Sequence, residues 1–254
     1  MIDLTKGFLP GRVIDVVNWH ITPRCGYNCK FCNVHNCYFE IRDLEYAKKN
    51  LQKLKVLEEQ DVHIKTLNIA GGDPLLHPYL FDLLKMGNER GFNLWITTNG
   101  TLLNETNVDQ LSNYVDGISV SVDCISNIKQ KKIGRGYGTH VTEMLNVSDQ
   151  IHDTGIKLGV NTLVTKLNYE DDLHALLHRL DPYQWNVYQT LPCLYQNNYL
   201  RSIEVNENDF YLFLRRHSHL RFGPCNEPTF WSKNDMLKAY YFLIDGTIKI
   251  CKVY

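Results

Sequence analysis

Three cysteines lie close together in the pattern Cys25-x3-Cys29-x2-Cys32. A loop that carries three thiolates can hold one face of a metal cluster and leave one metal atom without a protein ligand. Soft thiolate ligands favour an iron–sulfur cluster or zinc over hard cations. The spacing therefore predicts a metal centre with an open, catalytic position, and Cys25, Cys29 and Cys32 are its predicted ligands.

Two other interpretations of the cysteines remain open. Cys37 could be a fourth ligand and close a structural zinc site or a non-catalytic cluster, although zinc loops usually pair two close dyads. Cys29-x2-Cys32 alone could be a thioredoxin-like redox pair, but the additional cysteine and the long loop that follows do not suit the start of a helix. The remaining cysteines that we expect to be ordinary half-buried thiols are Cys124, Cys193 and Cys225.

The composition indicates one globular domain. The chain has 254 residues, 44% of them hydrophobic, and its 27 basic and 28 acidic side chains give a formal charge of −1. This balance gives no indication of binding to nucleic acid or to an anionic membrane. The first twelve residues do not resemble a secretory signal, and no apolar run approaches the ~20 residues that span a bilayer. We therefore expect a soluble, cytoplasmic monomer with reduced cysteines.

Short apolar runs alternate with helix-like segments as far as about residue 190. Strands are predicted at 13–22, 64–69, 94–97, 117–122, 157–164 and 185–190. Helices are predicted at 44–58, 79–90, 109–114, 141–153 and 170–180. Because parallel strands need such crossovers, the pattern predicts an α/β fold, a partial (β/α)6 barrel with its chemistry at the carboxyl ends of the strands. The cysteine loop, residues 23–40, leaves the first strand at that end.

The region after residue 190 has a different pattern. A helix is predicted at 206–217, and Asp245 and Gly246 form a turn signal between the apolar residues of a closing hairpin at 240–253. We assign residues 1–190 to the barrel core. Residues 191–254 are predicted to be a C-terminal extension that closes the substrate side.

Polar residues follow three successive predicted strands. They are Gly71-Gly72-Asp73-Pro74, Thr97-Thr98-Asn99-Gly100 and Ser121-Val122-Asp123. Each motif alone could be a turn or a helix cap. Because they recur at neighbouring strand ends, we expect them to contribute to one site.

Together these motifs resemble the radical S-adenosylmethionine superfamily. The cysteine spacing matches its signature, and Gly71-Gly72-Asp73-Pro74 is similar to its GGEP motif, with Asp in place of Glu. The resemblance implies a 4Fe–4S cluster and bound S-adenosylmethionine, with Asp73 on the amino group of the cofactor and Arg135 on its carboxylate. A solvated surface arginine is the alternative for Arg135. The residues that the resemblance assigns to the cofactor are Phe31, Gly71, Gly72, Asp73, Asn99, Ser121, Asp123 and Arg135.

Longer segments resemble the viperin family, in particular its prokaryotic members, from about Val16 to Cys251. These segments are Val17-Asn18-Trp19-His20, Ile133-Gly134-Arg135-Gly136, Val160-Asn161-Thr162, residues 181–189 and residues 234–245. The resemblance implies a radical lyase with an antiviral role. In that reaction a 5′-deoxyadenosyl radical takes the 4′ hydrogen of a ribonucleoside triphosphate. Loss of the 3′ hydroxyl as water and a one-electron reduction then give the 3′-deoxy-3′,4′-didehydro nucleotide, and an electron donor such as flavodoxin or ferredoxin is needed.

The same resemblance implies which residues serve the substrate. Asn18 and Asn161 would face it, and Tyr241 would lie near the sugar as a hydrogen or proton source, although packing alone could explain this tyrosine. His20 alternates with Asn18 on the first strand and is a further catalytic candidate. A hydrogen-bonded core histidine explains His20 equally well.

The sequence departs from the family pattern at three positions. Viperins have lysines for the phosphates where this chain has Thr66, Gly159 and Asn186. The departure keeps open a second hypothesis, a radical S-adenosylmethionine enzyme that acts on a different small molecule or on a peptide. A third hypothesis is a non-catalytic zinc or iron–sulfur protein.

Overall fold

The computed structural model describes residues 13–32, 34, 39–59, 61–190, 201–222, 226–239, 241–244 and 247–250. Within these residues the strands form one sheet in the order β7-β6-β5-β4-β3-β2-β1-β8-β9. Neighbouring strands are parallel from β7 to β8, and β9 is antiparallel to β8. The strands are β1 (Val13–Thr22), β2 (His63–Gly71), β3 (Asn93–Thr98), β4 (Gly117–Ser121), β5 (Lys157–Val164), β6 (Gln184–Gln189), β7 (Thr229–Trp231), β8 (Tyr241–Ile244) and β9 (Thr247–Ile250).

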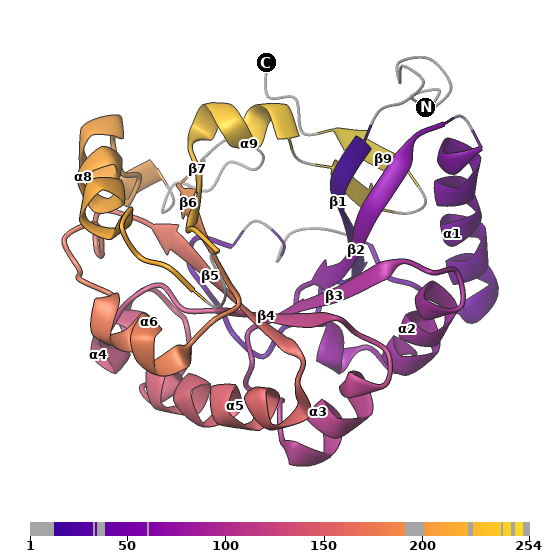
Figure 1. Ribbon diagram of the computed structural model, residues 1–254, viewed down its shortest axis with the longest axis horizontal. Coiled ribbons are helices and arrows are strands. Elements are labelled where there is room, and N and C mark those ends of the chain that lie inside the picture. The colour runs from indigo at the N-terminus through magenta and orange to yellow at the C-terminus, as the bar shows by residue number, and fades with distance from the viewer. Residues whose placement is uncertain are drawn as a thin grey trace.

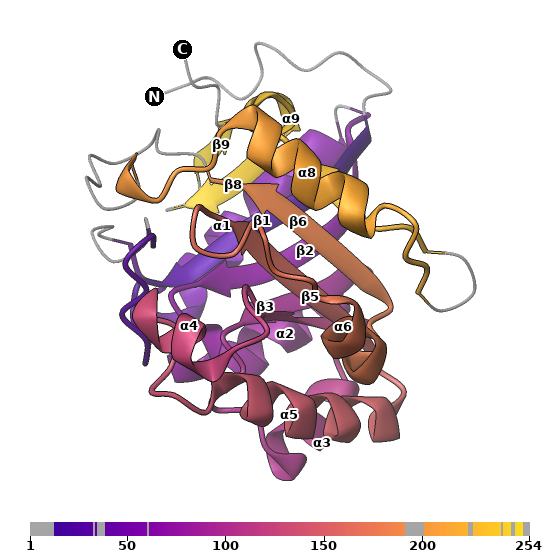
Figure 2. The same cartoon turned by 90° about the vertical axis from the view of Figure 1, so that its left-hand side faces the viewer.

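The sheet curls into a half-barrel, with helices along its convex side (Figure 1). The helices of the described chain are α1 (Leu44–Glu58), the short 3-10 helix η1 (Pro74–Leu76), α2 (Leu80–Asn88), α3 (Glu105–Ser112), α4 (Asn127–Lys132), α5 (His140–Thr154), α6 (His174–Leu180), α8 (Glu207–His217) and α9 (Lys233–Ala239). The view at right angles shows α4 at the edge of the barrel, close to the chain that follows β1 (Figure 2). No described helix is long and apolar enough to cross a membrane.

Alternation along the strands gives the sheet two chemically different faces. Val17 and Trp19 of β1 and Leu67 of β2 are fully buried in the core beneath the helices. The residues between them point to the concave side because successive side chains of a strand face opposite ways. Asn18 and Asn68 lie there as partners in neighbouring strands, both half-buried. A parallel sheet with one apolar and one polar face therefore leaves its concave side available for a polar ligand.

The predicted partial barrel is confirmed. All six predicted strands are present as β1 to β6, each within two residues of the predicted ends, and β8 with β9 forms the predicted C-terminal hairpin. Asp245 and Gly246 lie outside the described residues. The sequence did not indicate that β8 would pair in parallel with β1, where Asn18 is the partner of Phe242. The prediction that residues 191–254 close the substrate side stays a prediction.

Two predicted helix starts were wrong. Helix α3 begins four residues before position 109, because the Asn104 side chain accepts a hydrogen bond from the Asn107 amide and caps the helix. Helix α6 begins four residues after position 170, because the preceding residues form a turn in which Asn168 accepts from the Thr165 amide at 2.6 Å. The short helices α4 and α9 were not predicted.

Candidate active site

The three clustered cysteines lie on the loop that follows the carboxyl end of β1. All three are free thiols; Cys29 is buried, and Cys25 and Cys32 are half-buried. The Cys32 amide donates to the Cys29 carbonyl at 2.9 Å, a turn that keeps these two residues together. Cys37 lies outside the described residues, as do Cys193 and Cys225, whereas Cys124 is fully buried below the site.

Amide groups donate to the sulfur atoms of this loop. The Tyr27 amide donates to Cys25 Sγ at 3.4 Å, and the Asn99 side chain reaches the same sulfur from the end of β3 at 3.5 Å. The Val34 amide donates to Cys32 Sγ at 3.3 Å. Such donors stabilise thiolates, and hydrogen bonds to sulfur are one means by which proteins tune iron–sulfur clusters. Three soft donors on one loop, supported in this way, fit an iron–sulfur cluster better than a hard cation.

The glycine turn after β2 is fastened to the start of the cysteine loop. The Gly72 amide donates to the Thr22 carbonyl at 2.7 Å, and the Asp73 amide donates to the Arg24 carbonyl at 2.6 Å. A Cβ atom at Gly71 would lie 2.3 Å from the Thr22 oxygen, and one at Gly72 would lie 2.2 Å from the Arg24 oxygen. Only glycine permits this approach of two backbones, so the turn positions the loop that carries the cysteines.

Asp73 joins the ends of β2 and β3. Its buried carboxylate accepts from the Leu75 amide at 3.1 Å and from the Thr98 hydroxyl at 3.0 Å. Burial raises the pKa of Asp73, and these hydrogen bonds oppose the shift. The present contacts of Asp73 are thus internal, and its predicted contact with the amino group of the cofactor stays a prediction.

Asp123 and Arg135 form a buried ion pair next to the cysteine loop. Arg135 Nε donates to Asp123 Oδ2 at 2.5 Å, and the guanidinium carbon lies 5.2 Å from the centre of the Phe31 ring. Burial alone would lower the pKa of Arg135, but the Asp123 carboxylate raises it, so the guanidinium stays charged. Arg135 is therefore not the solvated surface arginine of the alternative interpretation. Its Nη atoms could bind a carboxylate while Nε stays on Asp123.

A tyrosine–histidine pair beside the loop was missed by the sequence analysis. His140 Nε2 lies 2.7 Å from the Ser121 carbonyl, which can only accept, so Nε2 carries the proton and Nδ1 accepts from the Tyr27 hydroxyl at 3.1 Å. Burial lowers the pKa of His140 to about 4, which keeps the ring neutral. The pair joins residues 113 positions apart, and no local pattern in the sequence indicates it. Ser121 itself lies at the end of β4, half-buried on the concave side.

The concave face carries a chain of uncharged hydrogen-bonding groups. Asn68 Nδ2 donates to Asn18 Oδ1 at 2.6 Å, and the Thr97 hydroxyl donates to Asn68 Oδ1 at 3.0 Å. On the other side of the half-barrel, Asn186 Nδ2 donates to Asn161 Oδ1 at 3.1 Å. Asn68 was not predicted, although its place between apolar residues of a strand was a signal for it. These amides can recognise hydroxyl and carbonyl groups of a ligand.

The two remaining catalytic candidates differ in what the structure describes. His20 lies on the same face of β1 as Asn18, 5.6 Å from the Phe39 ring between ring centres, and burial lowers its pKa to about 4. Its imidazole is therefore neutral near pH 7. For Tyr241 only the backbone is described; it begins β8, the strand beside β1.

Trp95 fills part of the concave face. A Cβ atom at Gly159 would lie 2.4 Å from Ser119 Oγ and 3.0 Å from the Trp95 ring, and a Cβ atom at Gly117 would lie 2.5 Å from the same ring. The Trp95 indole therefore lies over β4 at Gly117 and over β5 at Gly159, where the two strands have no side chain. A side chain at position 159 would therefore require Ser119 or Trp95 to move.

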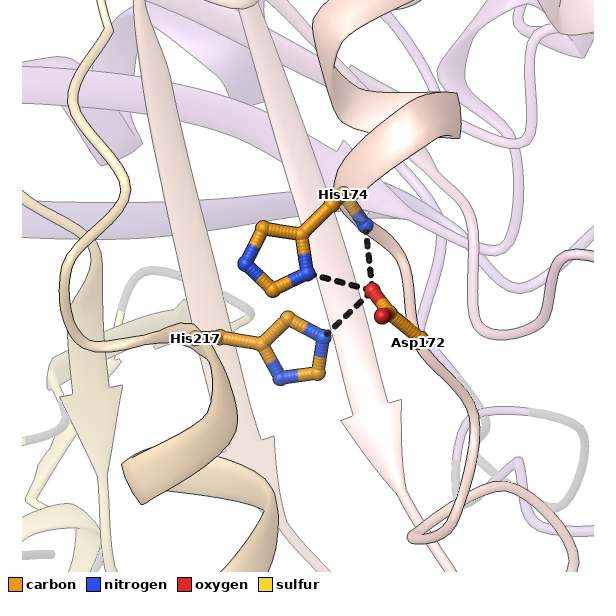
Figure 3. A group of neighbouring side chains, drawn as sticks. All are labelled: Asp172, His174 and His217. Carbon is orange, nitrogen blue, oxygen red and sulfur yellow. Dashed lines mark hydrogen bonds and ion pairs between the residues drawn. The ribbon is translucent and has the colours of Figure 1, made fainter.

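A separate group of titratable side chains consists of His174 and His217, whose rings stack 5.0 Å apart between centres, and Asp172, which contacts both rings from one side (Figure 3). His217 Nδ1 donates to the Phe213 carbonyl at 2.8 Å, and its Nε2 accepts from the Leu173 amide at 3.1 Å. A metal ion needs a free lone pair on the imidazole, and both ring nitrogens of His217 are engaged. The group is therefore a structural link between α8 and the start of α6.

Comparisons with known proteins agree with this architecture. Residues 19–180 match the family model described as the Radical SAM superfamily. The "S-adenosylmethionine-dependent nucleotide dehydratase" of Flammeovirga pacifica is 30% identical over 219 residues, which are 83% of this chain and 75% of that protein. The protein of the same name from Lacinutrix mariniflava is 29% identical over 91% of this chain but 49% of its own length, so this chain spans about half of it.

A solved structure shows the same fold. SuiB of Streptococcus suis, bound to S-adenosylmethionine, superposes with a TM-score of 0.60 at 17% identity, over 87% of this chain and 51% of that protein. At this identity the likeness supports the half-barrel alone.

Proposed function

We propose that this chain, which belongs to the radical SAM superfamily and, within it, to the S-adenosylmethionine-dependent nucleotide dehydratases, removes water from the ribose of a nucleotide. The observation that carries the proposal is the position of the three cysteines. Their loop leaves β1 at the carboxyl edge of a half-barrel whose concave face is lined with amide and hydroxyl groups. A reactive species formed at that loop would meet a ligand held by these groups.

Enzymes of this superfamily use a 4Fe–4S cluster and S-adenosylmethionine, and the donor set described above fits both. When bound and reduced, the two supply a 5′-deoxyadenosyl radical that can take a hydrogen atom from the substrate. Cys25, Cys29 and Cys32 would hold the cluster. Arg135 would bind the methionine carboxylate, with Asp123 fixing its guanidinium from behind.

The proposed overall reaction balances with two electrons and one proton. S-adenosylmethionine, a nucleotide, two electrons and a proton give methionine, 5′-deoxyadenosine, water and the 3′-deoxy-3′,4′-didehydro nucleotide. The water carries the 3′ hydroxyl. The two electrons would come one at a time from a protein donor such as a flavodoxin or a ferredoxin, and we propose that the enzyme works in the cytoplasm as a monomer.

The concave face would position the sugar. The Asn18 oxygen accepts from Asn68, so the Asn18 amide group would serve as the donor to a ribose hydroxyl. Asn161, held by Asn186, is placed to do the same from β5. Positioning of this kind brings a single C–H bond next to the radical and excludes competing reactions. Tyr241 is proposed as the group that donates near the sugar.

The test is anaerobic. The cluster is reconstituted and reduced with dithionite, S-adenosylmethionine is added, and 5′-deoxyadenosine is quantified with and without each of the four ribonucleoside triphosphates. Stimulation by at least one of them is the expected result. A matched pair of variants, Cys29→Ala in the cysteine loop and Cys124→Ala in the core, separates loss of the cluster from loss of any thiol.

A second candidate function follows from the side chains at positions 66, 159 and 186. Gly159 has no side chain and is packed against Ser119 and Trp95, and positions 66 and 186 carry uncharged side chains. A triphosphate needs several cationic donors, so a radical enzyme for a less charged substrate is the alternative. Cleavage of S-adenosylmethionine that does not respond to any nucleotide would favour it over the dehydratase.

A further inference from the structure

Helix α4 presents an unusual surface next to the cysteine loop. Ile128 is 80% exposed, and Lys131 and Lys132 follow it at three and four residues, so the three side chains share one exposed face of the helix. The opposite face is buried through Gln130 and Ile133. The exposed face of α4 therefore combines one apolar side chain with two cations.

Backbone contacts fix this helix against the cysteine loop. The Lys30 amide donates to the Ile133 carbonyl at the end of α4, at 3.0 Å. Gly134 has φ +88°, and a Cβ atom there would lie 2.3 Å from the Asn28 carbonyl and 3.1 Å from Cys29 Cα. Figure 2 shows α4 and the chain after β1 at the same edge of the molecule. The end of α4 is thus packed directly against the backbone that carries the predicted cluster ligands.

Tyr137 extends the same surface over the loop. Its side chain is 77% exposed. Its hydroxyl donates at 2.8 Å to the carbonyl of Gly26, the residue that follows Cys25. The Tyr137 ring also meets the Tyr27 ring edge to face, 5.8 Å between centres. We call the exposed residues Lys30, Ile128, Lys131, Lys132 and Tyr137 the α4 face.

The charge of this region differs from that of the whole chain. Residues 24–34 and 125–140 contain no Asp or Glu, whereas the complete chain has 27 basic and 28 acidic residues. Ion pairs link Arg24 with Glu40, Lys129 with Asp171 and Arg135 with Asp123. The cations in the two segments are Arg24, Lys30, Lys129, Lys131, Lys132 and Arg135. A locally basic surface on a neutral protein attracts an acidic partner and speeds its approach.

We infer that the α4 face is the docking surface for an acidic one-electron carrier protein, which delivers electrons to the cluster across the cysteine loop. The inference rests on the proposed function, because the proposed reaction consumes two electrons in each turnover. The carrier is oxidised by one electron at each visit, and the cluster is reduced by that electron. The occupant follows from the charge of the surface and from its position directly beside the three cysteines. Ile128 and Tyr137 would supply apolar contacts to the carrier, and the lysines would supply charged ones.

The experiment compares two reductants on the same reconstituted protein, without nucleotide. Reduction of the cluster by flavodoxin hydroquinone and by dithionite is followed by absorbance, for the wild type and for Lys131→Glu/Lys132→Glu. We expect the flavodoxin rate to fall by at least about tenfold at low ionic strength and the dithionite rate to stay within about twofold, since a small reductant needs no docking surface. The difference between wild type and variant should shrink as salt is added.

Three further variants test whether the lower flavodoxin rate depends on the position, the apolar contact and the charge of the α4 face. Lys49→Glu/Lys53→Glu makes the same charge change on α1, at the opposite side of the barrel, and should leave both rates unchanged (Figure 1). Ile128→Ser should lower the flavodoxin rate in a manner that does not depend on salt, because it removes an apolar contact. Lys131→Gln/Lys132→Gln checks that the effect of the glutamates scales with charge.

Equal flavodoxin rates for the wild type and the double glutamate variant would overturn the inference, as would an equal loss with both reductants. The result is independent of the nucleotide reaction. If no nucleotide stimulates cleavage of S-adenosylmethionine, the proposed function fails while the docking result still stands or falls on the reduction rates.

Discussion

The rim of the half-barrel and its concave face are built from different chemistry. The rim beside the cysteines is dense with buried charge and with backbone contacts, such as the Asp123–Arg135 pair and the Gly72 amide bonded to Thr22. The concave face carries uncharged hydrogen-bonding groups beside the cysteine loop, where Asn18, Asn68 and Asn161 supply amides and His20 is neutral. The rim carries the groups that we propose to hold the cluster and S-adenosylmethionine, and the concave face carries those that we propose to select the substrate.

The difference between the rim and the concave face predicts two different effects of substitutions. A change at the rim should abolish the radical chemistry with every substrate or destabilise the fold. A change on the concave face should leave slow cleavage of S-adenosylmethionine in place and weaken only its response to the nucleotide. The predictions that follow begin with the rim, where the expected effects are largest.

Cys29→Ala should reduce formation of 5′-deoxyadenosine to the background of the assay, because a cluster with two protein ligands is not retained. Iron content and product are measured together. Cys124→Ala removes a buried thiol outside the loop and should keep both. Retention of iron and activity by Cys29→Ala would show that the loop is not the cluster site.

Asp123→Asn should lower the free energy of unfolding by about 3–5 kcal/mol, because it leaves the buried Arg135 guanidinium without a counter-charge. The comparison is Asp149→Asn, which removes the exposed partner of Arg179 and should cost less than about 1 kcal/mol. Urea unfolding of both variants measures the difference. Similar losses for the two would mean that the buried pair is not an essential part of the rim.

Acid should weaken the link between α6 and α8. Burial lowers the pKa of His217 from 6.5 to about 4 in the folded protein, so the unfolded chain binds an additional proton between these values. Stability should therefore be highest above pH 6.5 and fall, through this histidine, by about 1.4 kcal/mol per pH unit towards pH 4. His217→Gln should be less stable at pH 7 but should lose less stability over this window. His178→Gln, an exposed change on α6, is the control.

Asn161→Ala should raise the KM for the nucleotide about tenfold, because one hydrogen bond to the sugar is lost. The KM for S-adenosylmethionine should stay unchanged. Asn113→Ala, an exposed asparagine after α3, is the matched control. An equal rise in both KM values would show that Asn161 also affects binding of S-adenosylmethionine and is not specific to the nucleotide.

The parts of the site that are local in sequence could be predicted. The cysteine spacing, the glycine turn at Gly71 and the polar ends of β3 and β4 are short motifs, and each lies where the alternation of strands and helices placed it. The start of α3 was predicted four residues too late, although Asn104 and Asn107, which form a capping box, are a local signal for it. Helix α4 was missed because six residues with three lysines show no apolar periodicity.

The long-range contacts could not be predicted. Tyr27 and His140 are 113 residues apart, and Asn18 and Asn68 meet only because β1 and β2 pair in one register. Which residue covers Gly159 depends on the rotamer of Trp95, two strands away. Such contacts are set by the packing of the whole sheet, and a single sequence without its relatives carries no local signal for them.

The central claim is that a radical formed at the cysteine loop takes hydrogen from the ribose of a nucleotide held on the concave face. The most direct test supplies nucleotides that carry deuterium at the 4′ carbon and measures the mass of the 5′-deoxyadenosine that forms. The account predicts that one deuterium appears in 5′-deoxyadenosine, together with a nucleotide product that has lost water. Formation of 5′-deoxyadenosine without deuterium, with the nucleotide unchanged, would contradict it.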